Sequence, residues 1–201
     1  MGFREYTKES WKGSVITAPL PPVLVSCGNT ERANVLTVAW TGILCTQPPV
    51  TYISLRRERF SYDIIKDSGE FVINLPTAEL VKVIDYCGVR SGRDIDKFSE
   101  TGLTAEKASE VSAPLIVQSP VNIECRVREI VPLGTHDMFI ADIVRVDAAK
   151  ELLDEKGRLA LERAGLLAYA HGGYFELGRK LGSFGFSVRK KKKKHSKGKQ
   201  V

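Results

Sequence analysis

Residues 34–61 read NVLTVAWTGILCTQPPVTYISLRRERFS. The first half is rich in β-branched and aromatic side chains, which predicts one long strand or two, with Gly42 as a bulge or a close backbone approach. A pair of prolines then forces a turn, and residues 50–55 alternate between the two faces as a strand does. A helix is expected over 62–68, and Gly69 ends it.

Similar runs occur on both sides of this stretch. Further strands are predicted over 22–28, 71–75, 121–131 and 138–146, and a second helix over 78–86. Residues 88–120 are polar and weakly periodic, which predicts a long loop with short helical turns. Many short strands with only two clear helices indicate a mainly β fold, a β-barrel decorated with helices, and parallel βαβ alternation is not seen.

Length and composition limit the class of protein. The chain has 201 residues, a mass of 22.2 kDa and 43% hydrophobic residues, which is enough for a core and suits one domain, expected over 1–187. It contains no apolar run of about 18 residues and no apolar segment of a secretory signal near its first residue. We therefore expect a soluble cytoplasmic protein that has no membrane partner.

The positive net charge comes from one end of the chain. Residues 189–199 carry eight Lys or Arg and no acidic residue, and subtracting them leaves 22 basic against 24 acidic residues. Such a run cannot bury apolar surface, so residues 188–201 are expected to be a disordered basic tail. It could contact nucleic acid or simply be a solvated terminus. No aromatic residue interleaves with the lysines, which argues against a nucleic-acid partner.

Side chains for acid–base, nucleophilic or metal chemistry do not form a recognisable pattern. The four cysteines contain no C-x-x-C pair, and His136 and His171 have no metal-ligating partner at helical or strand spacing, so no metal site is predicted. Phosphate-binding motifs of the P-loop and G-x-G-x-x-G types are absent, and we assign no catalytic side chain.

The first candidate site is the arginine cluster at the end of the predicted strand. Arg56, Arg57 and Arg59 lie within four positions and are followed by Ser61 near the start of the next helix. A helix N-terminus and guanidinium groups are both suited to phosphate oxygens, so this cluster could hold the phosphate of a nucleotide. Alternatively, Ser61 simply caps its helix, and the arginines are solvated or pair with carboxylates such as Glu58.

The second candidate is the run from Thr37 to Gly42, in which small and hydroxyl side chains alternate. A planar ring system needs backbone amides for its carbonyls and nitrogens, and small side chains that let it approach. Alternatively, the run is an ordinary barrel strand with Trp40 in the core.

Several of these stretches together resemble the flavin reductase-like family, in particular its flavoredoxin-type branch. The similarity extends over about residues 15–187, and the matching motifs, in order, lie at 34–42, 46–49, 53–61, 68–76, 91–98 and 134–142. The resemblance implies an FMN-binding split β-barrel of Greek-key-like order that acts as a homodimer, with the flavin near the subunit boundary.

The resemblance also implies residue roles. Residues that would line the isoalloxazine ring are Thr37, Ala39, Trp40 and Thr41. The flavin phosphate would fall to Arg56, Arg57, Arg59 and Ser61. Lys97 would be a further contact on the flavin side or the dimer side. His136 would orient NAD(P)H, although a plain histidine at a hairpin end is the alternative.

The activity implied is electron transfer from NAD(P)H through bound FMN to a flavin, a protein or another acceptor. Hydride transfer needs no protein acid, base or nucleophile, which agrees with the lack of a catalytic dyad in the sequence. The alternative is an electron-transfer protein of the flavoredoxin type, which a partner protein reduces and which has no NAD(P)H activity.

Overall fold

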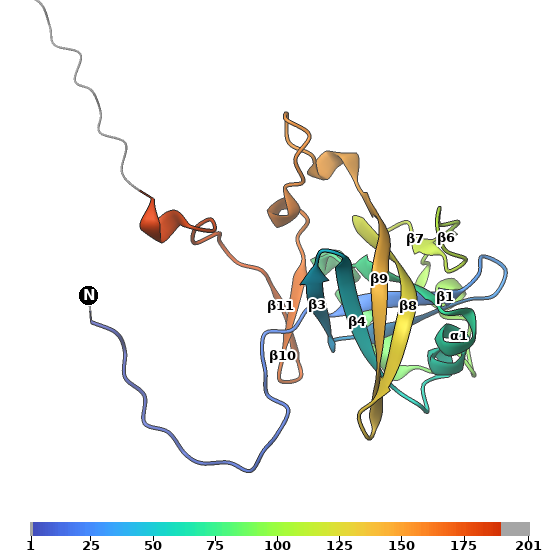
Figure 1. The fold of residues 1–201 in the computed structure, drawn as a ribbon, viewed down its shortest axis with the longest axis horizontal. Coiled ribbons are helices and arrows are strands. Elements are labelled where there is room, and N and C mark those ends of the chain that lie inside the picture. The colour runs from blue at the N-terminus through green and yellow to red at the C-terminus, as the bar shows by residue number, and fades with distance from the viewer. Residues whose placement is uncertain (1, 190–201) are drawn as a thin grey trace, which may run out of the picture.

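The computed structural model describes residues 2–189, and a seven-stranded antiparallel sheet forms its body (Figure 1). The strand order is β2-β1-β5-β8-β9-β4-β3. The bounds are β1 Val23–Gly28, β2 Ala33–Val38, β3 Thr41–Thr46, β4 Pro49–Arg56, β5 Glu70–Leu75, β8 Val121–Pro132 and β9 His136–Ala148. The sheet contains three hairpins, β1–β2, β3–β4 and β8–β9. Strand β5 lies between β1 and β8, and β4 pairs with β9, so the order of the strands in the sheet differs from their order in the chain. The predicted mainly β, Greek-key-like fold is confirmed.

Smaller elements complete the fold. The helices are α1 Phe60–Ser68, α2 Val81–Val89 and α3 Lys97–Thr101, with 3-10 turns at Ala78–Leu80, Lys150–Leu152, Leu161–Arg163 and Phe186–Val188. Two small hairpins consist of β6 Ala105–Glu106 with β7 Leu115–Ile116, and of β10 Leu167–Ala170 with β11 Gly173–Glu176. The predicted loop over 88–120 therefore contains α3, β6 and β7.

The run that we predicted as one long strand or two forms two strands, β2 and β3, separated at Ala39 and Trp40. Gly42 is a close backbone approach, because a Cβ atom built there would lie 3.2 Å from the Tyr52 ring on β4. The bulge lies one position later, between Ile43 and Cys45.

The main core lies on the face of the sheet that α1 covers. Tyr62 and Ile65 of α1 pack with Phe71 and Phe139 of the sheet, and all four are buried. Burying a side chain of this size contributes about 2 kcal/mol, so this cluster holds the two halves of the sheet around the helix. Gly69 ends the helix in the left-handed conformation with φ 68°, as predicted.

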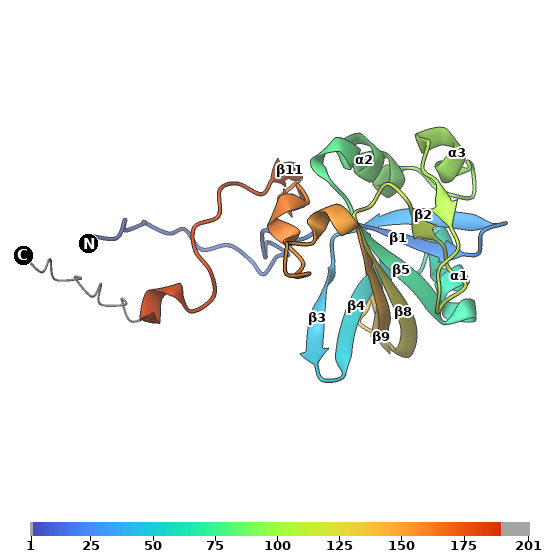
Figure 2. The same cartoon turned by 90° about the horizontal axis from the view of Figure 1, so that it is seen from above.

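Helices α2 and α3 cover the opposite face of β1 and β2 (Figure 2). Ile84 and Cys87 of α2 and Phe98 of α3 are buried against Leu24 and Val35 of those strands. Because this packing fixes the C-terminal end of α2 beside β2, the loop after α2 is held near the end of β4.

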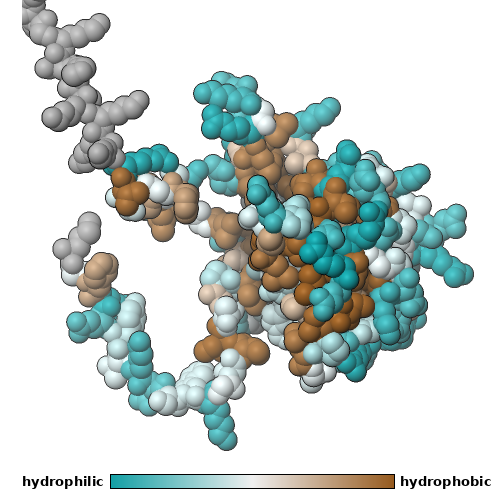
Figure 3. Space-filling view, viewed as in Figure 1, coloured by the Kyte–Doolittle hydropathy of each residue, from teal (hydrophilic) through white to brown (hydrophobic). Residues whose placement is uncertain are grey.

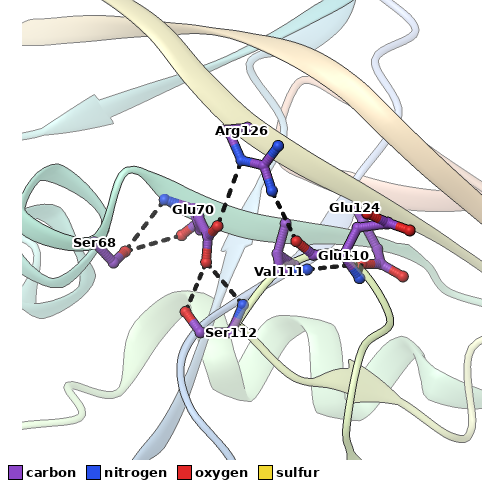
Figure 4. Close-up of polar contacts among 7 residues, drawn as sticks. All are labelled: Ser68, Glu70, Glu110, Val111, Ser112, Glu124 and Arg126. Atoms are coloured by element: carbon purple, nitrogen blue, oxygen red, sulfur yellow. Dashed lines mark hydrogen bonds and ion pairs between the residues drawn. The ribbon is translucent and has the colours of Figure 1, made fainter.

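A buried carboxylate holds the loop that precedes β7. Glu124 of β8 is fully buried and accepts hydrogen bonds from the backbone amides of Ser109, Glu110 and Val111. Figure 4 shows Glu124 beside Glu110 and Val111. Beside it, Glu70 accepts two hydrogen bonds from Ser112. The backbone amides of this irregular loop have no strand partner, and the two carboxylates satisfy them instead.

Two arms extend from this body. Residues 2–19 and the segment that follows β11 run outward, and both carry exposed apolar side chains (Figure 3). In the described part of the chain, no helix is long and apolar enough to cross a membrane. The predicted basic tail over 188–201 lies outside the described residues from position 190 onward.

Candidate functional site

Two adjoining clefts lie between the end of β4, the strand β2 and the helix α2. The larger, which we call the ring cleft, has a volume of about 520 Å³, and the smaller, the anion pocket, about 280 Å³. Leu36, Arg56 and Arg59 line both, so the two clefts meet at this point.

The ring cleft contains three of the four residues predicted to line a planar ring. Thr37, Ala39 and Trp40 line it, together with Ser54 on β4. Thr37 donates a hydrogen bond of 2.5 Å to the carbonyl of Ile84, which ties β2 to α2. Thr41 is not among the lining residues, because its buried hydroxyl donates to the Tyr52 carbonyl on β4.

One alternative for this segment placed Trp40 in the core, and the structure shows that this alternative is wrong. Its side chain is 39% exposed and meets His136 edge to face, with ring centroids 4.5 Å apart. His136 opens β9 opposite Arg56, and it lines the ring cleft as well. Burial first, and the charge of Arg56 second, lower the pKa of the imidazole below its ordinary value. The lowered pKa favours the neutral form of the imidazole in the cleft.

The anion pocket is lined by five cationic side chains, and Glu58 is the one carboxylate among its described lining residues. The cations are Arg56, Arg59, Arg90, Arg93 and Lys97. Backbone carbonyls position two of the guanidinium groups: Arg59 donates to Gly88 at 3.1 Å, and Arg93 donates to Glu58 at 2.8 Å. Within residues 2–189, the guanidinium of Arg56 contacts one side chain, the Glu58 carboxylate, in an exposed ion pair of 3.5 Å. The first turn of α1 borders the pocket and adds its partial positive charge.

Lys97 is the least exposed of these cations. Its side chain is buried, and its ammonium donates hydrogen bonds of 2.8 Å to the carbonyls of Val35 and Cys87. Among residues 2–189 it forms no ion pair with a carboxylate, and burial lowers the pKa of the ammonium. Since an ammonium has three donors, one remains for a ligand in the pocket.

This set of donors fits a phosphate monoester. A phosphate dianion presents several strong acceptor oxygens, and the pocket offers guanidinium forks and a buried ammonium with little negative charge to compete. A buried ammonium without an anion is unfavourable, so a bound anion would relieve the desolvation of Lys97. The residues present therefore fit a ring with a phosphate at its end.

Near the phosphate, Arg57 lies outside both clefts, and the alternative that Ser61 caps its helix is wrong. The guanidinium of Arg57 makes a bidentate pair with the buried Asp137, with N–O distances of 2.9 and 3.0 Å, and lines neither cleft. Ser61 does line the pocket but does not cap α1, because Arg59 occupies the N-cap position without a side-chain cap bond. Ser61 is instead buried and accepts a hydrogen bond of 2.6 Å from Asn34.

Several lining residues were not predicted. Arg90 and Arg93 follow α2, and Arg93 falls inside the motif at 91–98, which was the available signal. Asp85, Tyr169 and Tyr174 line the ring cleft from segments far apart in sequence. No local pattern marks these three, since their placement depends on the packing of α2 and of the β10–β11 hairpin.

Comparisons with known proteins identify the family and the fold. A family model described as flavin reductase like domain matches residues 17–178. The solved structure of flavoredoxin from Desulfovibrio vulgaris (Miyazaki F) has a TM-score of 0.84 and 29% identity, and covers 91% of this chain and 100% of that chain. The expected split-barrel fold is thereby confirmed.

Curated relatives are also similar. An uncharacterized protein of Archaeoglobus fulgidus is 33% identical over 138 residues, 69% of this chain and 77% of that protein. An NADPH-flavin oxidoreductase of Streptomyces viridifaciens is 24% identical over 152 residues, 74% of this chain and 77% of that protein. Because the family model spans most of the sequence, this chain belongs to the flavin reductase like family.

Proposed function

We propose that this protein binds FMN, with the isoalloxazine ring in the ring cleft and the phosphate in the anion pocket. The observation that carries the proposal is the meeting of the two clefts at Arg56 and Arg59, which joins a partly aromatic cavity to a strongly cationic one. Thr37, Ala39 and Trp40 would face the ring. Arg56, Arg59, Ser61 and Lys97, together with Arg90 and Arg93, would hold the phosphate.

The proposed activity is that of an oxidoreductase that takes electrons from NAD(P)H and passes them to a flavin, a protein or another acceptor. FMN, when bound, supplies the redox chemistry. The protein supplies position and electrostatics: the cationic pocket anchors one end, and the cleft walls orient the ring. His136 would orient the nicotinamide as a neutral hydrogen-bonding group, which its lowered pKa supports. The relative named NADPH-flavin oxidoreductase also supports a nicotinamide donor.

The second candidate function is an electron carrier that a partner protein reduces. The similarity to flavoredoxin favours it. An anaerobic titration distinguishes the reductase from the electron carrier: NADH is added to one sample of the FMN-loaded protein, and NADPH to another. Loss of the visible flavin absorption supports the reductase, whereas an unchanged spectrum with both nucleotides supports the carrier. Protein that takes up no FMN would refute both.

We also propose that the protein is a homodimer. Strand β3 is an edge of the sheet, and Ile43 and Leu44 on it are 67% and 47% exposed. The arm over 2–19 leaves the body beside Pro22, which lines the ring cleft, and carries exposed apolar residues such as Trp11. A symmetric pair of chains would cover the β3 edge and the arms at once, which supports a second copy as the partner.

A further inference from the structure

We infer that the buried carboxylate of Asp137 positions His136 in the ring cleft, because it ties the first residues of β9 to α1 and to the turn after β4. Asp137 is thus a positioning residue for electron transfer from NAD(P)H, and in this respect the inference rests on the proposed function. It gives a functional role to a carboxylate that lines neither cleft.

Asp137 is the meeting point of side chains from three segments. Its side chain is buried, and its two oxygens accept hydrogen bonds of 2.9, 3.0 and 3.2 Å from the guanidinium of Arg57, in the turn after β4. One oxygen also accepts a hydrogen bond from the Tyr62 hydroxyl on α1. The bonds from Arg57 first, and from Tyr62 second, lower the pKa of the Asp137 carboxyl. An ionised carboxylate therefore fastens β9 to two other segments.

The direction of the His136 side chain is linked to that of Asp137. The two residues are neighbours in β9, so their side chains lie on opposite faces of the strand. Asp137 faces α1, where Tyr62 also packs edge to face on Phe139, with ring centroids 5.2 Å apart. His136 faces the ring cleft and contacts Trp40. Holding one side chain on the α1 face therefore keeps the other in the cleft.

His136 has few contacts of its own that could fix it there. It follows directly after the turn at 133–135, which projects from the sheet and in which Leu133 is 59% exposed (Figure 1). Among the described residues, the imidazole has one side-chain hydrogen-bond partner, the Thr135 hydroxyl, 2.9 Å from Nδ1, and Thr135 belongs to the same turn. Chain segments with few buried contacts open locally. The buried bonds of Asp137 are the anchor nearest to His136 in the strand.

The carboxylate does not act on the imidazole mainly through its charge. The charged side chains that face the imidazole are Arg56, Glu58 and Arg59. The charge of Asp137 is instead balanced by Arg57. A positioning role and a charge effect predict opposite changes when the carboxylate is replaced by an amide. Loss of a nearby negative charge would lower the pKa of His136, whereas release of the imidazole into water would raise it toward its ordinary value.

The first test uses the flavin-free full chain and reports the contact between two rings. A protonated imidazole quenches the fluorescence of an indole that it touches, and Trp40 lies against His136. Trp11→Phe removes the other indole of the chain, which is exposed. In this background, lowering the pH should quench Trp40, and His136→Asn should abolish the quenching. Asp137→Asn should reduce the quenching about twofold or more and shift its midpoint upward, toward about pH 6.5.

The second test measures flavin reduction by NADH, and separately by NADPH, in the FMN-loaded variants. Asp137→Asn should slow the reduction about tenfold and leave the Kd for FMN within about twofold, as His136→Asn should. Because Asp137 acts through His136, the double variant should be no slower than His136→Asn alone. Independent effects of the two residues would multiply instead, and would overturn the inference.

The matched control is Asp142→Asn, which makes the same substitution in the same strand at a carboxylate that forms an exposed pair with Arg128. It should leave the quenching and the reduction rate unchanged, and circular dichroism should show that the variants are folded. If Asp137→Asn does not fold, Tyr62→Phe takes its place, because it removes one hydrogen bond of the carboxylate and keeps the ring that packs on Phe139. It should change the quenching in the same direction.

Unchanged quenching in folded Asp137→Asn, or in Tyr62→Phe where Asp137→Asn does not fold, would overturn the inference. A midpoint that moves downward, or wild-type protein in which Trp40 is not quenched at low pH, would also overturn it. Wild-type protein that neither nucleotide reduces would refute the proposed reductase activity, and the fluorescence test would still decide whether Asp137 positions His136.

Discussion

The indole of Trp40 and the imidazole of His136 meet edge to face, with their ring planes inclined at 73° and their centroids 4.5 Å apart. The two residues come from distant parts of the chain, Trp40 from the link between β2 and β3 and His136 from the first position of β9. Their contact joins two segments at one wall of the ring cleft. A ligand ring in that cleft would therefore lie against a surface that both side chains shape.

Replacing His136 by Asn should slow flavin reduction by NAD(P)H about tenfold and leave FMN affinity within about twofold, because the imidazole is proposed to orient the nicotinamide and not the phosphate. Stopped-flow absorbance under anaerobic conditions measures the rate. His171→Asn is the control, since His171 lies in the β10–β11 turn and does not line the ring cleft. An unchanged rate of flavin reduction in the His136→Asn variant would show that His136 does not orient the nicotinamide.

The pH dependence of stability should report on the same residue. The pKa of His136 is lowered in the native state, so the unfolded chain binds more protons at pH values between the native pKa and the ordinary one. The stabilisation from the neutral imidazole is complete above the unfolded pKa and is lost as the pH falls. His136→Asn should therefore show a smaller drop in melting temperature than the wild type between about pH 7.5 and about pH 5.5. Equal drops would argue against a shifted pKa.

Replacing Lys97 by Met should separate ligand binding from folding. The Kd for FMN should rise about 10- to 100-fold, because a charge-assisted hydrogen bond to the phosphate is lost. The melting temperature of the flavin-free protein should stay the same or rise, because a buried ammonium without a carboxylate is costly to desolvate. Lys82→Met, which changes an exposed residue of α2, is the control. A large loss of stability with unchanged FMN affinity would make Lys97 purely structural.

Arg57 and Arg59 are two positions apart, and their substitutions should have opposite effects. Arg59→Ala should weaken FMN binding about tenfold and change stability little, since this guanidinium borders both clefts. Arg57→Ala should leave FMN affinity unchanged and lower the denaturant midpoint, because Asp137 loses its bidentate partner. Titration and urea unfolding on both variants provide the measurement. The opposite pattern would restore the assignment of Arg57 to the phosphate.

The proposed dimer can be tested at the β3 edge. Wild-type protein should elute with twice the mass of the 22.2 kDa chain in size-exclusion chromatography with light scattering. Ile43→Glu should shift it to the monomer, because a charge on an exposed apolar edge opposes its burial. Leu133→Glu introduces the same charge at an exposed turn between β8 and β9, and should leave the mass unchanged. A wild-type protein that elutes as a monomer would refute the proposal.

Local sequence patterns predicted most of the strands and the helix α1, because runs of β-branched residues and a glycine at a helix C-terminus determine secondary structure within a few residues. They could not distinguish Arg57 from Arg59, since that choice depends on Asp137, 80 residues away in sequence, which pairs with Arg57 across the sheet. The alternative role of Ser61 as a helix cap fails because α1 begins at Phe60, two residues before the expected start, which places Ser61 inside the helix. Arg90 was missed because only the packing of α2 on β2 brings it to the pocket.

The most direct test of the central claim, that the guanidinium and ammonium groups of the anion pocket hold a flavin by its phosphate, is a comparison of FMN with riboflavin. The two share the ring and the ribityl chain and differ only in the phosphate. Titration of the flavin-free protein should give a Kd for riboflavin at least about 100-fold higher than that for FMN, and the difference should shrink as salt is added. Equal affinities at low salt, or no binding of FMN, would contradict the account.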